Sequence, residues 1–250
     1  MRKNNLVVLC ILVVLVIAEA NVVFGQTDET AKIRVLVVTG EDHPSHNWRE
    51  VAPILRNNLN TDKAIDCRLS DDLEMLGTDV IFDYDVLVCY FKNYKPLKRD
   101  EQVKKNLTTF IENGGGLVLI HFTCGAFEGE LWFEQIVGRV WDPKKRAHDP
   151  YGEFEVEYVD NKHPITNGLK NFKIADELYT CLKDSKITIH VLAESTSKVD
   201  KKRYPMVFVL EKGKGKIFHT TLGHNIQSVS NPDFKILLQR AVYWMKNRTL

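Results

Sequence analysis

The chain has 250 residues, enough for one domain, and its 44% hydrophobic and 27% charged residues are ordinary for a globular fold. The 34 basic residues nearly cancel the 33 acidic ones. A formal net charge of +1 provides no broad positive field to attract phosphates. The composition therefore argues against a nucleic-acid-binding protein, and we expect no nucleic-acid partner.

The first 25 residues have the pattern of a signal peptide. Two positive charges, Arg2 and Lys3, precede an apolar run over residues 6–18, and small residues follow as far as Gly25. The run is shorter than the roughly 20 residues that a bilayer span needs, so we favour cleavage over an uncleaved membrane anchor. We expect an exported protein, periplasmic or secreted, with a single mature domain over residues 26–250 and a core over about 33–246.

Strands alternate with helices in the first half of the chain. Short β-branched runs predict buried strands over residues 33–39, 65–69, 86–90 and 117–121. Helical spacing of apolar residues predicts helices over about 51–59 and 99–112. This order is typical of an α/β fold with a mainly parallel sheet and helices on both faces. Such sheets bind ligands at the carboxyl ends of their strands.

The pattern changes in the second half, where polar and apolar residues alternate over 154–158, 188–192 and 206–210. Alternation is typical of half-exposed, antiparallel strands. Residues 213–216 are predicted to form a hairpin turn before a strand over 216–222, and a helix is predicted over 232–246.

Four histidines lie where predicted strands pass into loops. His43 and His46 follow the first strand, His121 ends the fourth, and His224 follows the strand over 216–222. Any one of them could be a structural hydrogen-bonding residue. Because they share one edge of the sheet, we expect them to form a polar pocket, where imidazoles can exchange protons, bind a metal or donate to sugar hydroxyls.

Other residues that could serve this pocket are less clear from the sequence. Trp48 shares a loop with His43 and His46, although that loop could merely cap the following helix. Glu177 is a candidate general acid or base if burial raises its pKa, and it could equally be a surface carboxylate. His148 belongs to a further polar loop.

Cys124 is a poor candidate for a nucleophile. It follows the fourth strand, but the strained turn of a nucleophile elbow needs glycines on both sides, and only Gly125 is present. The mature chain also contains Cys67, Cys89 and Cys181, with no CxxC pair to suggest a zinc knuckle. Export permits disulfides, and the sequence leaves their pairing open.

Taken together, several segments resemble the ThuA-like family, named for trehalose utilisation. They occur in order along nearly the whole mature chain, and they are Val38–Gly40 with His43, His46 and Trp48; Gly114–Val118 leading to His121; His163–Ile165; Asp176–Tyr179; and Gly213–His224.

This resemblance implies a flavodoxin-like sheet related to class I glutamine amidotransferases, without their cysteine nucleophile and glutamine chemistry. It also implies a role in disaccharide or glycoside catabolism beside a sugar oxidoreductase. The positions that match the family are His43, Trp48, His121, Glu177, Tyr179, Gly223 and His224. Cys124 departs from the family, whose members tend to have a small or polar residue there.

We therefore expect an enzyme that acts on a keto-sugar or a related glycoside as a lyase, isomerase or hydrolase. The expected catalytic residues are His121, His224 and Glu177. The expected substrate-binding residues are His43, His46, Trp48, Tyr179 and His148. A divalent metal such as zinc, if one is bound, is expected on His43, His121, Glu177 and His224.

Two other interpretations remain open. The chain could be a non-catalytic sugar-binding module in which Trp48, Tyr179 and Trp132 stack on sugar rings. It could also be a subunit of a sugar oxidoreductase assembly, for which an exposed apolar patch would be the sign.

Overall fold

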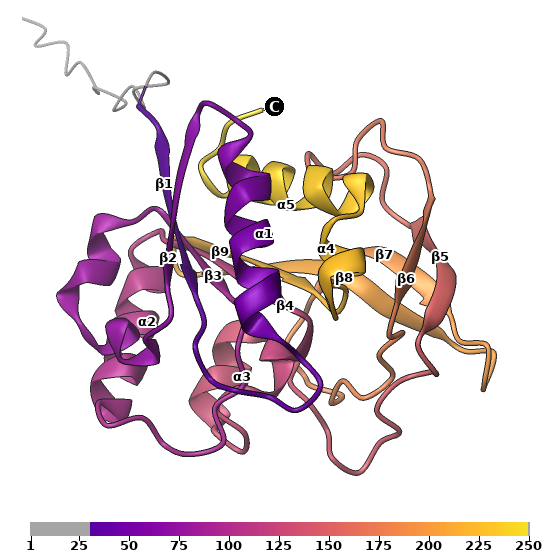
Figure 1. Cartoon of the computed structure of the whole chain (residues 1–250), viewed down its shortest axis with the longest axis horizontal. Helices are drawn as coiled ribbons and strands as arrows, with labels where there is room; N and C mark the ends of the chain where they lie inside the picture. Colours follow the sequence, from indigo (N-terminus) through magenta and orange to yellow (C-terminus); the bar gives the residue numbers. More distant parts are fainter. Residues whose placement is uncertain (1–30, 250) are drawn as a thin grey trace, which may run out of the picture.

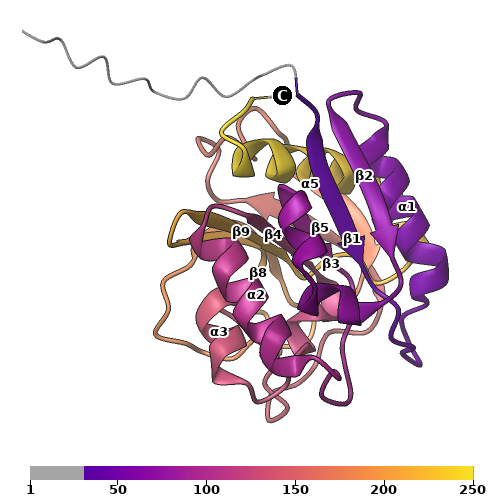
Figure 2. The same ribbon diagram turned by 90° about the vertical axis from the view of Figure 1, so that its left-hand side faces the viewer.

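The computed structural model describes residues 31–249, which form one α/β domain around a nine-stranded sheet (Figure 1). The expected signal peptide over residues 1–25 lies outside the described residues. No described helix combines the length and apolar character needed to cross a membrane. The two ends of the described part of the chain lie side by side, where Arg248 Nη1 donates to the Ala31 carbonyl at 2.8 Å (Figure 2).

The strands, in chain order, are β1 (Ile33–Val38), β2 (Ile65–Ser70), β3 (Val86–Cys89), β4 (Gly116–Ile120), β5 (Gly152–Tyr158), β6 (Phe172–Asp176), β7 (His190–Thr196), β8 (Arg203–Lys212) and β9 (Gly215–Thr220). The α-helices are α1 (Trp48–Asn60), α2 (Asp100–Glu112), α3 (Leu131–Val137), α4 (Ile226–Val229) and α5 (Pro232–Met245). Three 3₁₀ helices are η1 (Leu73–Gly77), η2 (Asp79–Asp83) and η3 (His121–Gly125).

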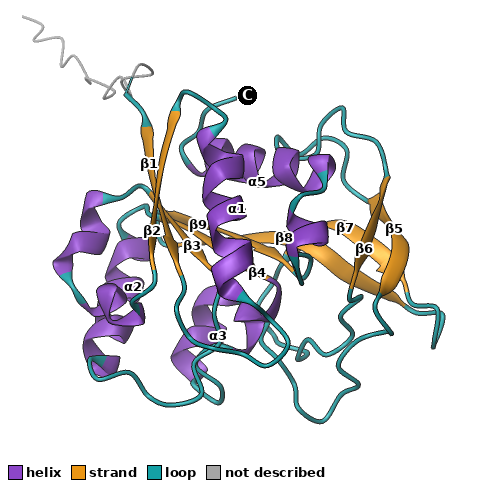
Figure 3. Cartoon of the chain, in the orientation of Figure 1, coloured by secondary structure: helices purple, strands orange, loops and turns teal. Residues whose placement is uncertain are grey.

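The sheet has a parallel half and an antiparallel half, in the order β2-β1-β3-β4-β9-β8-β7-β5-β6. Strands β2, β1, β3, β4 and β9 pair in parallel, whereas β8, β7, β5 and β6 continue the sheet in antiparallel pairs. This arrangement confirms the predicted fold class. Figure 3 shows the loops that follow β1 and β3 at the same edge of the sheet.

Helices cover both faces of the sheet, as the buried β-branched strands require. On one face α1 and α5 pack against side chains such as Val35, Val37 and Val118. On the other face α2 and α3 pack against Leu36, Leu87 and other side chains of opposite orientation. Packing in the two apolar layers fixes the positions of the strands. It therefore also fixes where the loops with the polar residues begin.

The loop after β1 is pinned by a close backbone approach. Gly40 has φ +126°, and a Cβ there would lie 1.9 Å from the Asp71 carbonyl oxygen in the loop after β2. Only glycine fits both that conformation and that space. The close approach therefore places the following residues, which include His43 and His46, above the end of β1.

Three sequence predictions need correction. Strand β6 was not predicted, because its five residues are bounded by no glycine or proline signal. Strand β7 starts at His190 and runs to Thr196, later than the predicted 188–192. Alternating burial holds for β5 and β6, but residues 206–210 of β8 are buried on both faces, because helices cover both sides there.

The four cysteines of the described chain are all buried and free of disulfides: Cys67, Cys89, Cys124 and Cys181. Burial raises the pKa of Cys67 and of Cys89 to about 12, so neither thiol is ionised at neutral pH. The sequence left the pairing of these cysteines open, and the described structure pairs none of them.

His219 is a wholly buried imidazole in the middle of β9, packed on Phe208 with ring centroids 4.6 Å apart. Burial lowers its pKa from 6.5 to about 3. In the unfolded chain this imidazole is therefore protonated below about pH 6.5, whereas in the folded chain it is protonated only below about pH 3. The contribution of neutral His219 to the free energy of unfolding is fully present above about pH 6.5 and is lost as the pH falls from there toward about pH 3.

We therefore predict that His219→Phe reduces the loss of stability in acid. The difference should grow by up to roughly 1.4 kcal/mol for each pH unit below the unfolded-state pKa. Urea unfolding between pH 7 and pH 4 measures it, with the other histidines common to both proteins. Parallel stability curves for the two proteins would contradict this prediction.

Candidate functional site

Polar side chains from distant parts of the chain meet at the edge where the parallel strands end. The loop after β1 contributes His43 and His46, and η3 after β4 contributes His121. The residue after β6 is Glu177, and the loop after β9 contributes His224. The rings of His46, His121 and His224 lie within 5.3 Å of one another, measured between centroids.

His121 occupies the strained position at the end of β4, with φ 52°. Its Nδ1 lies 2.7 Å from the Thr221 carbonyl, which can only accept, so Nδ1 donates and the neutral ring has its lone pair on Nε2. Nε2 lies 3.0 Å from the Tyr179 hydroxyl and 3.3 Å from Glu177 Oε2. The backbone thus directs an imidazole lone pair at a carboxylate.

This strained strand-to-helix turn is where a nucleophile elbow would hold its nucleophile. In this chain the positive φ belongs to His121, whereas Cys124 follows within η3. Cys124 is wholly buried and packs with Tyr179 and Cys181. The structure therefore gives the elbow an imidazole in place of a thiol.

His46 is held by stacking and by its neighbour in the same loop. Its ring lies parallel to Phe122, with centroids 4.2 Å apart. Nδ1 lies 2.7 Å from His43 Nδ1, which already accepts from the Ser45 amide at 3.1 Å. His46 Nδ1 is therefore the donor, and its Nε2 is a buried lone pair with no hydrogen-bond partner within residues 31–249.

The Asp176 carboxylate positions both Glu177 and His224. It is fully buried and accepts from the amides of Gly223 at 2.7 Å, Glu177 at 2.8 Å and His224 at 3.3 Å. Gly223 has φ +116°, and a Cβ there would lie 2.6 Å from Ile120 Cγ2, so glycine is required next to His224. One carboxylate therefore ties the end of β6 to the loop after β9.

Glu177 is ionised in this setting. Its Oε2 lies 3.3 Å from His121 Nε2 and 3.2 Å from His224 Nδ1. Burial alone would raise the pKa of Glu177, but hydrogen bonds and charge from His121 and His224 in their protonated forms outweigh burial and hold that pKa well below its usual range. The direction of this pKa shift therefore favours the ionised carboxylate, which can act as a base or a ligand, over a protonated general acid.

Four ligand atoms converge in a geometry that suits a divalent cation. One atom each from His46, His121, Glu177 and His224 lies within 4.8 Å of the other three. Tetrahedral zinc with bonds of about 2.0–2.1 Å places its ligand atoms roughly 3.3 Å apart, close to the two distances from Glu177 Oε2. His224 Nδ1 is buried 3.2 Å from that oxygen, and among residues 31–249 it has no hydrogen-bond partner.

The surroundings also fit a metal centre. A ligating histidine usually donates its other ring N–H to a carbonyl or another acceptor, and His121 and His46 both do so. The structure changes one expected ligand, because His46 and not His43 belongs to the convergent set. His43 instead accepts a hydrogen bond from His46 through its Nδ1 and so fixes the orientation of the His46 ring. We call His46, His121, Glu177 and His224 the four-residue centre.

A cavity of about 170 Å³, the inner pocket, opens beside this centre. Its lining side chains include His43, Lys92, Trp141, His148 and Tyr179 as well as His46 and Glu177. Its shape and its mixture of rings and charges suit a small polar ligand.

The inner pocket also includes a histidine with a defined tautomer. His148 Nδ1 lies 2.7 Å from the Asp149 carbonyl and must donate, which leaves a lone pair on Nε2. Nε2 lies 3.6 Å from Glu177 Oε1. His148 is thus an acceptor that faces the pocket next to a carboxylate.

Trp48 is the one expected site residue that lies neither in the four-residue centre nor in the lining of the inner pocket. It is the first residue of α1, 9% exposed, and packs in the core on the α1 face of the sheet. Its indole N–H donates to Asp42 at 2.9 Å, and the Arg49 guanidinium lies 4.4 Å from its ring. All the other expected residues meet at the centre or line the pocket.

Sequence reasoning missed three residues of this site. Asp176 was noted only as the neighbour of Glu177, and no sequence signal indicates a carboxylate that binds three amides. Lys92 follows β3, so the strand-end rule applied to that strand would have found it. Trp141 lies in the long loop between α3 and β5, where no periodic pattern exists.

Fold and site together define a flavodoxin-like α/β domain with a histidine at the elbow. The chain belongs to the ThuA family, described as trehalose utilisation, whose family model matches residues 34–245. This membership gives the protein a carbohydrate-related role. No curated protein matches the sequence.

Solved structures share the fold at low sequence identity. A ThuA-like protein from Parabacteroides merdae is 21% identical, covering 87% of this chain and 91% of its own, with TM-score 0.74. One from Bacteroides uniformis is 19% identical, covering 88% and 94%, with TM-score 0.70. A Thermoplasma acidophilum protein described as part of a GMP synthase is 12% identical, covering 86% and 95%, with TM-score 0.53. These likenesses show the fold alone.

We predict that the chelator-treated protein binds one zinc ion through the four-residue centre, measured by isothermal titration calorimetry. His46→Ala should weaken binding by about 100-fold or more, because it removes a ligand where even outer-shell changes cost 10–100-fold. His190→Ala is the matched control, since that imidazole is exposed and pairs with Asp160. Equal zinc affinity in His46→Ala and the control would refute the centre.

Asp176→Asn tests the positioning role of the buried carboxylate. The amide keeps the size but turns an N–H₂ group toward a backbone donor, so the Glu177 and His224 backbones should separate. We expect zinc affinity to fall by about 10- to 100-fold and stability by about 1–3 kcal/mol. Calorimetry on the folded variant measures the first, and wild-type affinity there would contradict the role.

Proposed function

We propose that this chain is an exported enzyme of disaccharide or glycoside catabolism that acts on a keto-sugar, or a related glycoside, in the inner pocket. The trehalose-utilisation family supports the carbohydrate class. The observation that carries the proposal is the convergence of His46, His121, Glu177 and His224 beside that pocket.

The chemistry starts from the acidity that a keto group gives to the neighbouring C–H. The enzyme then needs a group that stabilises the developing oxyanion and a base that takes the proton. A divalent cation held by the four-residue centre would supply the first as a Lewis acid, provided that its shell expands from four to five ligands to admit the carbonyl oxygen. Isomerisation and β-elimination of a keto-glycoside both begin with this proton transfer.

His148 is suited to take the proton. Its Nδ1–H is fixed on the Asp149 carbonyl, so Nε2 presents a lone pair to the inner pocket. The Glu177 Oε1 atom, 3.6 Å away, would stabilise the imidazolium that forms. His43 complements it, since its Nδ1 accepts from Ser45 and its Nε2–H is left to donate to a sugar oxygen.

This proposal changes the roles expected from the sequence. His121, His224 and Glu177 were expected to be catalytic in acid–base steps, and in the proposal they hold the centre. The proton passes to His148, which was expected only to bind substrate. The keto-sugar itself would come from an oxidation step, such as that of a sugar oxidoreductase.

The interpretation as a binding module has less support from the geometry. It requires Trp48, Tyr179 and Trp132 to stack on sugar rings. Trp48 lies in the core, and Trp132 packs on Phe127 with centroids 5.0 Å apart, so Tyr179 alone of the three lines the inner pocket.

We expect the zinc-loaded protein to convert 3-keto-trehalose or a related keto-glycoside, followed by mass spectrometry, and the chelated protein to be inactive. His148→Gln should lower kcat by about 10²- to 10⁴-fold, the usual value of a general base. It should retain zinc affinity, and His190→Ala should behave as the wild type.

Turnover that survives chelation would exclude the metal-dependent step and leave acid–base catalysis by the imidazoles. Saturable sugar binding without product, at every keto-glycoside tried, would favour the binding module. Full activity in His148→Gln would remove that residue from the mechanism.

A further inference from the structure

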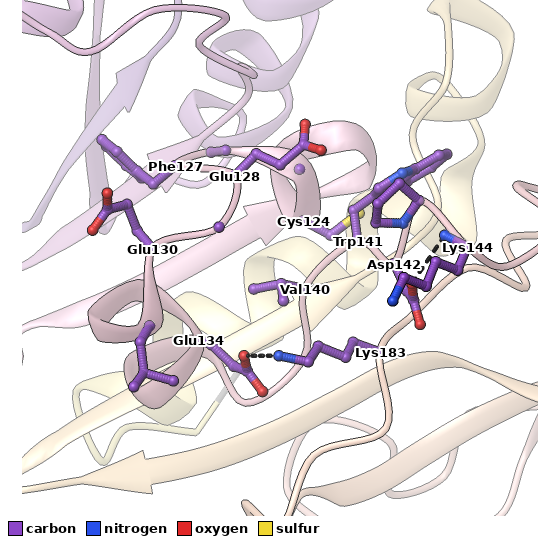
Figure 4. A pocket seen from close by; sticks show the side chains of 15 residues that line it. Cys124, Phe127, Glu128, Glu130, Glu134, Val140, Trp141, Asp142, Lys144 and Lys183 are labelled. Carbon is purple, nitrogen blue, oxygen red and sulfur yellow. Dashed lines mark hydrogen bonds and ion pairs between the residues drawn. The ribbon is translucent and has the colours of Figure 1, made fainter.

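We propose that a second cavity next to the inner pocket is a subsite for the second ring, or the aglycone, of a neutral glycoside whose reacting ring lies at the four-residue centre. We call it the outer pocket, and Figure 4 shows its lining. This inference rests on the proposed function, because it assumes that the inner pocket binds a sugar.

The two cavities are neighbours that share a wall. Gly125 and Trp141 line both of them. The Trp141 amide donates to the Cys124 carbonyl at 2.9 Å, which fixes the tryptophan beside η3. Its ring meets Tyr179 edge-on, with centroids 5.8 Å apart, and Tyr179 in turn contacts His121. A ligand with one ring at the four-residue centre would therefore extend past Trp141 to reach the outer pocket.

The volumes divide in the way that a two-ring ligand requires. The inner pocket is about 170 Å³, below the roughly 300–1,000 Å³ usual for small-molecule pockets, so it suits one ring. The outer pocket is about 380 Å³, which falls within that range. A disaccharide at the centre must therefore place its second ring elsewhere, and the adjoining cavity is large enough.

The lining of the outer pocket suits a carbohydrate in particular. Phe127, Leu131, Val140 and Trp141 provide apolar surface for the C–H faces of a ring. Charged groups stand around them, including the ion pair of Lys183 Nζ with Glu134 Oε2 at 2.6 Å (Figure 4). Such pairs can donate to and accept from hydroxyl groups.

The charges of the outer pocket favour a neutral ligand. The two lysines of the lining, Lys144 and Lys183, are outnumbered by four carboxylates, which are Glu128, Glu130, Glu134 and Asp142. Two of these carboxylates are already paired, Glu128 with Lys92 and Glu134 with Lys183. A phosphate or a carboxylate ligand would therefore meet more negative groups than positive ones. The class of ligand is therefore a neutral disaccharide or an aryl or alkyl glycoside, and not a sugar phosphate.

The test compares a two-ring with a one-ring ligand on the full zinc-loaded chain. The probes are 3-keto-trehalose and 3-keto-glucose, titrated by calorimetry in the His148→Gln background, in which turnover is slowed. We expect the two-ring ligand to bind at least about tenfold more tightly than the one-ring ligand, because its second ring buries additional apolar surface.

Two variants narrow or weaken the outer pocket without touching the inner one. Leu131→Trp adds bulk at an exposed rim position, and Lys144→Ala removes a donor. Leu131→Trp should reduce the two-ring preference to about threefold or less and leave one-ring affinity unchanged. Val80→Trp, on an exposed position of η2, is the matched control and should keep the full preference.

The outcomes separate this inference from the proposed function. Equal affinity for both probes, or an undiminished preference in both outer-pocket variants, overturns the subsite while the inner pocket remains a sugar site. Failure of both probes to bind overturns the proposed function, and the subsite with it.

Discussion

The site depends on the hydrogen bonds that the buried Asp176 carboxylate accepts from the backbone. This carboxylate accepts from three backbone amides, so it holds the residue after β6 and the loop after β9 at a fixed separation. Burial raises the pKa of Asp176 despite these hydrogen bonds, so the three donors offset only part of the cost of a charge in the interior. Because β6 belongs to the antiparallel half and β9 to the parallel half, this contact joins both halves of the sheet at the pocket.

The remaining geometry follows from backbone partners that fix each imidazole. The Thr221 and Asp149 carbonyls determine which nitrogen of His121 and His148 carries the proton. In the neutral rings, the Nε2 lone pairs of His121 and His148 are therefore oriented toward Glu177 without any bound ligand. The strain at His121 is consistent with this role, since unusual backbone angles persist where the surroundings over-determine them.

Much of the architecture could be predicted from the sequence, because runs such as residues 33–38 and 116–120 are strongly β-branched or apolar and their ends are marked by glycine or histidine. The strand-end rule also predicted that His43, His46, His121 and His224 would meet. It could not distinguish His43 from His46 as a member of the centre, because that depends on how two rings of one loop share a proton. Nor could it place Trp48 in the core or assign Asp176 its three amides, since both depend on packing between distant segments.

The central claim is that His46, His121, Glu177 and His224 form one coordination site, and anomalous diffraction from zinc-soaked crystals tests it most directly. The account predicts a single strong zinc peak bonded to all four side chains at about 2.0–2.2 Å. An empty centre at saturating zinc, or a peak only at surface histidines such as His190, would contradict it.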